Sequence, residues 1–156
     1  MTAPERPRPT SLQDLQNLLG VELGPTRWHL VDQAIIDGFA DITGDRQWIH
    51  VEPARAAESP FGSTIAHGLY SLSLTPALLE ELMAFDGFAH SLNYGYDRVR
   101  FIHPLPVNSR IRLRAELITV EQTPNGQIHV VTRLTIEAEG IDKPILVADS
   151  IGRFSA

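Results

Sequence analysis

The stretch Gly68–Met83, GLYSLSLTPALLEELM, is the longest apolar segment of the 156-residue chain. Its leucines leave few polar faces, so the segment predicts a helix that is buried in the centre of a domain. Gly68 stands at its beginning, where a helix exposes backbone N–H groups that have no acceptor inside the helix. We therefore expect the core to form around this helix.

The pattern changes after residue 90, where apolar residues alternate with arginines and other polar residues. A period of two is typical of strands that have one buried and one solvated face. Asn125-Gly126 is a strong hairpin signal between two of these segments. We expect strands over 98–101, 110–117, 128–138 and 145–154. Helices followed by a run of antiparallel strands indicate an α+β domain, with a long central helix wrapped by an antiparallel sheet.

Shorter elements precede the central helix. Asp32 is a typical N-cap, and Gly44 tolerates the left-handed backbone that often ends a helix. We expect, in chain order, a helix from Ser11 to Gly20, a strand over Thr26–Val31, a helix between Asp32 and Gly44, and a short helix that begins at Pro53.

Composition limits the class of protein. A chain with 43% hydrophobic and 21% charged residues is that of one ordinary globular domain. Residues 1–10 carry three of the eleven prolines, so we expect a disordered or loosely packed arm there and a single domain over 11–156. No apolar run is long enough for a membrane span or an export signal, which favours a cytoplasmic protein.

Charge and cysteine content exclude several functions. The formal net charge of -6 argues against nucleic acid as a partner, because phosphate binding needs a basic surface. The absence of cysteine excludes disulfides, thiolate metal sites and cysteine nucleophiles. None of the histidines shows a recognised metal-ligand spacing with another, so we expect no metal.

The stretch Ile42–His50, ITGDRQWIH, brings a carboxylate and an imidazole five residues apart. On one helix, Asp45 and His50 would lie about 140° apart, so they converge only if a turn intervenes. Gly44 supplies a break for such a turn. A carboxylate beside an imidazole is a suitable pair for moving protons between water and carbon. The alternative is ordinary turn chemistry for the aspartate and a partly buried structural histidine.

Two motifs and their order resemble the MaoC-like dehydratases, a family that includes the (R)-specific enoyl-CoA hydratases. The family pattern is an aromatic residue, Thr/Ser-Gly-Asp, Asn-Pro and a His five residues after the Asp, then Ala-His-Gly or a similar step before the central helix. The matching residues are Phe39, Thr43, Gly44, Asp45, His50, Ala66, His67 and Gly68. Gln47-Trp48 replaces Asn-Pro, as in a branch similar to nodulation protein N. The resemblance extends from about Thr26 to the end of the chain.

The resemblance implies a hotdog fold and the reversible hydration of a trans-2-enoyl thioester to a (3R)-hydroxyacyl thioester. Asp45 and His50 would be the catalytic pair, with the base among them left open, and the Gly68 amide would polarise the thioester carbonyl. The substrate would be an acyl-CoA or acyl-carrier-protein thioester, with no cofactor. The family also implies a homodimer whose sheets meet edge to edge, with acyl tunnels near the interface.

We assign substrate binding to residues in the motifs and on the first long strand: Gln47, Trp48, His67, Arg98 and Arg100. The arginines belong to an alternating row that continues on the next strand and could meet the phosphates of coenzyme A or of a carrier-protein arm. The alternative is a solvated sheet face. Fold alone also leaves open an acyl-CoA thioesterase or a non-catalytic acyl-thioester-binding protein.

Overall fold

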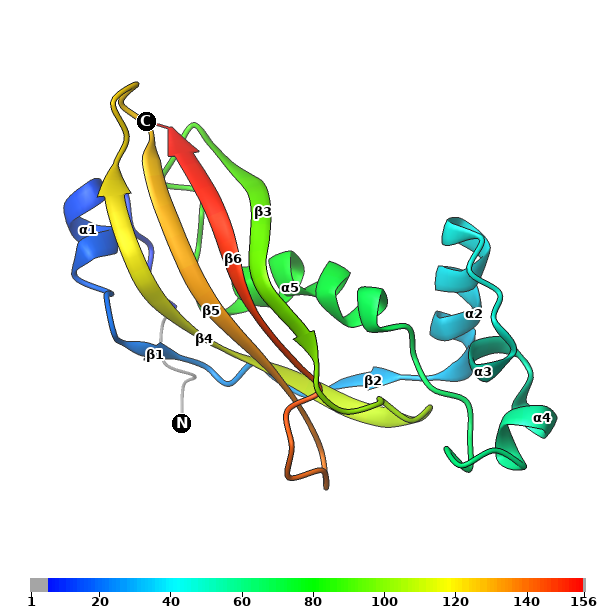
Figure 1. Cartoon of the computed structure of the whole chain (residues 1–156). Helices are drawn as coiled ribbons and strands as arrows, with labels where there is room; N and C mark the ends of the chain where they lie inside the picture. The colour runs from blue at the N-terminus through cyan, green and yellow to red at the C-terminus, as the bar shows by residue number, and fades with distance from the viewer. Residues whose placement is uncertain (1–5, 156) are drawn as a thin grey trace.

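The computed structural model describes residues 6–155, in which a long helix crosses one face of a curved sheet (Figure 1). The helix is α5 (Gly68–Leu82). The strands are β1 (Glu22–Leu23), β2 (His29–Val31), β3 (His90–Phe101), β4 (Ser109–Gln122), β5 (Ile128–Ala138) and β6 (Leu146–Ser155). The predicted central helix wrapped by an antiparallel sheet is confirmed.

The sheet runs in the order β1-β4-β5-β6-β3, and β2 also pairs with β4. All of these pairs are antiparallel. The predicted hairpin turn joins β4 to β5, where Gly126 has a φ of 83° that suits glycine. Strand β3 lies at one edge and pairs only with β6 among the described strands. Its other edge is therefore unpaired.

The core lies between α5 and the concave face of the sheet. Burial alternates along β4 and β5, as the period of two predicts. Leu113 and Ile136 from the sheet are fully buried, and Leu78 from α5 is 3% exposed. Full burial of such a side chain contributes about 1.5–3 kcal/mol to the hydrophobic free energy of folding. Together these contacts fix α5 against the sheet and set the position of its N-terminal end.

The N-terminal elements cover the β4 side of the sheet. Helix α1 (Leu12–Gln16) begins at Ser11 as predicted, and Ser11 Oγ accepts the Asp14 N–H at 3.1 Å. It ends earlier than predicted because the chain turns toward β4, where the Gly20 N–H donates to the Leu117 carbonyl at 3.0 Å.

The strand predicted over Thr26–Val31 is shorter than expected, since only His29–Val31 pair regularly as β2. Thr26 joins β4 in another way. Its Oγ1 accepts the Leu113 N–H at 3.0 Å, and its own N–H donates to the Leu113 carbonyl at 2.9 Å. The chain is thus tied to β4 before β2 begins.

The arm predicted at 1–10 lies partly outside the described residues, which begin at 6. Residues 6–10 contact the segment that follows α5. The Pro7 carbonyl accepts the Ala84 N–H at 2.9 Å, and Arg8 forms a 2.8 Å ion pair with Asp86. Pro9 is buried. These contacts hold the described part of the arm against the domain.

Three helices gather beyond the N-terminal end of α5, to one side of the sheet (Figure 1). They are α2 (Gln33–Thr43), α3 (Trp48–Val51) and α4 (Pro53–Ala57). The boundaries predicted for α2 are confirmed: Asp32 accepts the Ile35 N–H at 2.9 Å, and Gly44 is left-handed with a φ of 79°. The start of α4 at Pro53 is also confirmed, whereas the single turn α3 was not predicted. Within residues 6–155, none of the helices is long and apolar enough to cross a membrane.

Candidate active site

Asp45 stands directly after the left-handed residue that ends α2. The Gly44 N–H donates to the Ala40 carbonyl at 2.9 Å, which closes the helix and turns the chain toward α5. The Asp45 side chain is exposed, and the Gln47 N–H points to its Oδ1 at 3.4 Å. The carboxylate is therefore open to solvent and to a ligand.

His50 lies on α3 and is 6% exposed. Its Nδ1 is 2.7 Å from the Ile65 carbonyl oxygen. Because a carbonyl oxygen only accepts, Nδ1 carries the proton and the neutral ring keeps a lone pair on Nε2. Burial lowers the pKa of His50, and a charge on His67 would lower it further, while the Ile65 bond and Asp45 act in the opposite direction. The ring is thus poised to accept a proton or a hydrogen bond.

His67 immediately precedes α5 and is 2% exposed. Its Nε2 donates to the Asp45 backbone carbonyl at 2.9 Å. The His67 ring stacks on the His50 ring with their centroids 3.7 Å apart. The centroid of the Phe39 ring, on α2, lies 5.0 Å from that of His67. Its Nδ1 is buried without a partner among the described residues. His50 and His67 thus tie the loop after α2 to the segment before α5, each by a bond to the other segment's backbone.

The structure brings Asp45, His50 and His67 together, since one nitrogen of each ring and one carboxylate oxygen lie within 4.8 Å of one another. Two imidazoles and a carboxylate can exchange protons with a shared water molecule. The same donor types also bind Zn²⁺. The sequence expectation of a metal-free site stays a prediction.

Gly68 is the first residue of α5, so its N–H has no acceptor within the helix. A Cβ at this position would lie 2.8 Å from the Phe101 ring. Glycine avoids this clash, because the Phe101 ring of β3 rests against the helix start.

These residues line a pocket of about 340 Å³. Its other walls come from the loop between α4 and α5, from the start of α5 and from the segment around the end of β3, including Phe61, Leu69, Ser71, Phe101, His103 and Leu105. Ser71 and His103 were not predicted from the sequence, because no local pattern indicates that they line the same pocket as Asp45. A second cavity of about 420 Å³ lies further along α5, against β3, β5 and β6. Its walls include Thr75, Leu79, Met83, Tyr96 and Phe154.

Four residues predicted to bind substrate line neither the pocket at Asp45 nor the second cavity. Gln47 is exposed, and Trp48 is half-buried with the Arg55 guanidinium 4.4 Å from its ring centroid. Arg98 is left-handed with a φ of 53° and lies 3.9 Å from Asp149, while Arg100 donates to the Val99 carbonyl at 2.7 Å. Their roles in binding stay predictions.

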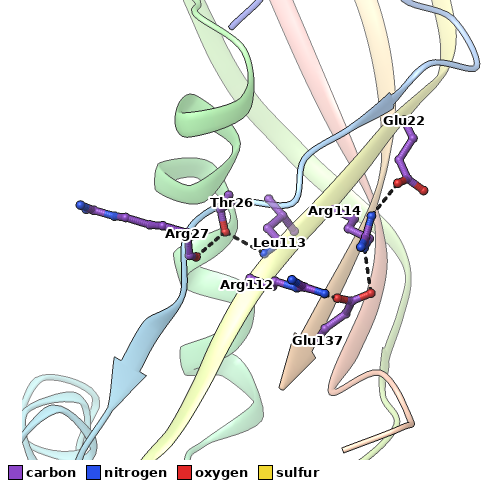
Figure 2. Close-up of polar contacts among 7 residues, drawn as sticks. All are labelled: Glu22, Thr26, Arg27, Arg112, Leu113, Arg114 and Glu137. Carbon is purple, nitrogen blue, oxygen red and sulfur yellow. Dashed lines mark hydrogen bonds and ion pairs between the residues drawn. The ribbon is translucent and has the colours of Figure 1, made fainter. Parts of the chain in front are cut away.

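The arginines of β4 are paired with carboxylates (Figure 2). Arg112 and Arg114 both bond to Glu137 of β5, at 2.8 and 2.9 Å, and Arg114 also reaches Glu22 at 2.6 Å. Arg110 pairs with Glu139 in the same way. The arginines of β4 therefore lie on a solvated sheet face with cross-strand ion pairs. This is the alternative to phosphate binding that the sequence left open.

Known proteins resemble the chain over nearly its whole length. Residues 14–140 match the family described as MaoC like domain. The chain is 44% identical to 3-hydroxyacyl-thioester dehydratase Z of Mycobacterium tuberculosis over 146 residues. The matched region covers 94% of this chain and 97% of that protein. Nodulation protein N of Rhizobium meliloti is 42% identical over 143 residues, with 90% and 89% covered. The structure of an R-hydratase from Pseudomonas aeruginosa superposes with a TM-score of 0.68 at 20% identity, covering 88% and 81%, which confirms the hotdog fold.

Proposed function

Because the chain belongs to the MaoC-like dehydratase family, we propose that it catalyses the reversible hydration of a trans-2-enoyl thioester to a (3R)-hydroxyacyl thioester. The observation that carries the proposal is the meeting of Asp45 and His50 in a pocket that also contains the start of α5. A base, a water-orienting group and a carbonyl-polarising group are the parts that this reaction needs.

In the proposed mechanism, water lies between the Asp45 carboxylate and Nε2 of His50. His50 accepts a hydrogen bond from one of the two water O–H groups and so orients the molecule, since its Nδ1–H is held by Ile65. As the water oxygen bonds to C3, Asp45 takes the other proton and the π electrons of the C2–C3 bond move toward the thioester carbonyl. The pair then delivers that proton to C2, the carbonyl reforms, and one molecule of water has been added.

Gly68 would bind the thioester oxygen while it carries negative charge. Its N–H lies at the positive end of the α5 dipole, where developing negative charge is stabilised. A donor that is already in position costs no reorganisation during the reaction. This geometry would favour the enolate-like intermediate over the ground-state carbonyl.

The acyl chain would extend along α5 into the larger cavity. That cavity has mostly apolar side chains, such as Leu79, Met83 and Phe154. A thioester bound at Gly68 would direct its acyl group along the helix, toward these residues. His67 would contact the substrate at the pocket, and Arg98 and Arg100, with Gln47 and Trp48, would contact the coenzyme A or carrier-protein arm outside it.

We propose that the protein works as a homodimer through β3. Within residues 6–155 one edge of this strand is unpaired, and large apolar side chains lie exposed on the strand, including Leu92 at 55% and Tyr94 at 67%. Unpaired edges with exposed apolar residues favour association with another strand. Pairing of two β3 strands would join the two sheets edge to edge.

The test is hydration of crotonyl-CoA, followed by loss of enone absorbance. We expect activity in the wild-type protein, and a loss of about 100- to 10,000-fold in Asp45→Asn and in His50→Gln. Asp142→Asn, the same change as Asp45→Asn at an exposed position that lines neither cavity, should leave activity unchanged. Full activity in both site variants would refute the assignment.

The same samples test the two alternatives. Release of free thiol, detected by a disulfide-exchange dye, would identify a thioesterase. Binding of crotonyl-CoA without turnover would identify a non-catalytic binding protein. Either result would contradict the proposed function.

A further inference from the structure

Three hydroxyl residues follow one another at alternate positions on α5, and one of them differs from the others. Ser73 Oγ donates to the Tyr70 carbonyl at 2.7 Å, and Thr75 Oγ1 donates to the Leu72 carbonyl at 2.8 Å. These bonds to the preceding turn are the usual solution for a hydroxyl within a helix. Ser71 Oγ makes no hydrogen bond to any residue of the described chain, although Ser71 is only 1% exposed.

A buried hydroxyl without a partner lowers the stability of the folded state, because it has lost its hydrogen bonds to water. Alanine would avoid this cost and also has a higher helix propensity than serine. Neither packing nor helix formation therefore explains a serine at position 71. A partner that arrives with a ligand would explain it.

The position of Ser71 indicates which part of the ligand this would be. Ser71 lines the same pocket as Gly68, His50 and Asp45. It follows Gly68 by three residues, so both lie on one face of the first turn of α5. Side chains on a helix lean toward its N-terminus, which places the Ser71 hydroxyl over the turn that begins at Gly68.

We propose that the Ser71 hydroxyl is a second hydrogen-bond donor to the thioester carbonyl oxygen, beside the Gly68 N–H. This inference rests on the proposed function. The hydroxyl keeps its proton throughout and moves no charge. It stabilises the oxygen while the electrons of the C2–C3 bond reside there, and this interaction is stronger in the transition state than in the bound substrate.

His67 offers the competing partner, because it lines the same pocket and its Nδ1 is also buried without a hydrogen bond to any residue that the structure describes. A Ser71 hydroxyl that only donated to His67 would serve to orient that ring. The two roles differ in a measurable way. A donor to the carbonyl changes the electronic structure of a bound thioester, whereas a donor to His67 leaves it unchanged.

The first experiment compares Ser71→Ala with Ser73→Ala, the same change two residues along the helix. For hydration of crotonyl-CoA, we expect kcat of Ser71→Ala to fall on the order of 100-fold with little change in KM, as for loss of one donor to an oxyanion. Ser73→Ala should keep wild-type kcat. Urea unfolding should show Ser71→Ala to be at least as stable as the wild type, so the loss would not reflect misfolding.

The second experiment needs no turnover. A conjugated aryl-enoyl thioester, cinnamoyl-CoA, is bound to Asp45→Asn, and its absorbance maximum is recorded. Polarisation of the carbonyl should shift the maximum to longer wavelength, and adding Ser71→Ala should reduce this shift while adding Ser73→Ala should not.

The outcomes separate the two levels of the proposal. An inactive wild-type protein would refute the proposed function. If the wild type is active and kcat of Ser71→Ala is within threefold of the wild-type value, only the role of Ser71 is refuted. The same holds if adding Ser71→Ala to Asp45→Asn leaves the absorbance shift of bound cinnamoyl-CoA unchanged.

Discussion

Gly68→Ala tests whether the start of α5 is positioned by its contact with Phe101. The added methyl would lie 2.8 Å from Cγ and Cδ1 of the ring, where ordinary contacts begin at 3.4 Å. The ring or the helix start must therefore retreat by about 0.6 Å. Overpacking of this kind costs about 1–3 kcal/mol, and the better helix propensity of alanine offsets up to about 1 kcal/mol of it. We expect the free energy of unfolding to fall by about 0–3 kcal/mol.

The effect on catalysis should be larger than the effect on stability. A shift of about 1 Å in a positioned group can reduce the rate on the order of 100-fold, which corresponds to about 2.7 kcal/mol in the barrier. We therefore expect kcat/KM for crotonyl-CoA to fall by about that factor, while urea unfolding shows a protein that is still folded. The matched variant is Phe101→Ala, which removes the ring.

The double variant decides the cause. If the clash displaces the helix start, Gly68→Ala should cost little further activity when it is added to Phe101→Ala. The ring that causes the clash is then absent, so the double variant should be nearly as active as Phe101→Ala. The two substitutions would then be coupled by about 1–2 kcal/mol. Wild-type kcat/KM in Gly68→Ala, or strictly additive effects in the double variant, would refute the reasoning.

Two further outcomes follow from the same geometry. Burial lowers the pKa of His50 below its ordinary 6.5, so the unfolded chain binds a proton that the folded chain does not, and the wild type should lose stability as pH falls below about 6.5. Urea unfolding at about pH 8 and about pH 5.5 should show a weaker pH dependence in His50→Gln, and an equal dependence would contradict the buried neutral ring. For the β3 edge, sedimentation velocity should give a dimer of the 17.3 kDa chain and a monomer after Leu92→Lys with Tyr94→Lys, whereas a monomeric wild type would exclude the dimer.

Local chemistry explains why most elements could be predicted. Asp32 and Gly44 mark the ends of α2 because N-capping and left-handed termination involve only neighbouring residues. The turn at Asn125-Gly126 is local in the same sense. Helix α3 has a single turn, Trp48–Val51, which is too short for a periodic pattern to indicate it. That unpredicted turn carries His50.

Sheet register shows where local reasoning ends. Extending the β4–β5 hairpin regularly from the pair Gln122 and Ile128 would place Arg112 opposite Ala138. A bulge between Leu117 and Thr119 shifts the pairing by one residue, so Arg112 lies opposite Glu137 and bonds to it. No residue in the sequence indicates this bulge, yet it decides which carboxylates the arginines meet. The alternation was therefore predictable and the ion pairs were not.

The site follows the same division between local and distant causes. Asp45 and His50 could be singled out from a nine-residue stretch. Their convergence, however, depends on the segment 65–67, which follows α4 in the chain, whereas Asp45 and His50 precede it. His50 bonds to the backbone of that segment and His67 bonds back to Asp45, so neither ring is oriented by its own neighbours. The Asp45 carboxylate is exposed, whereas both imidazoles are buried. Of the three titratable groups, it is therefore the one with an exposed side chain. A site built by such reciprocal bonds should lose its geometry as a unit, because removing either ring releases the segment that orients the other.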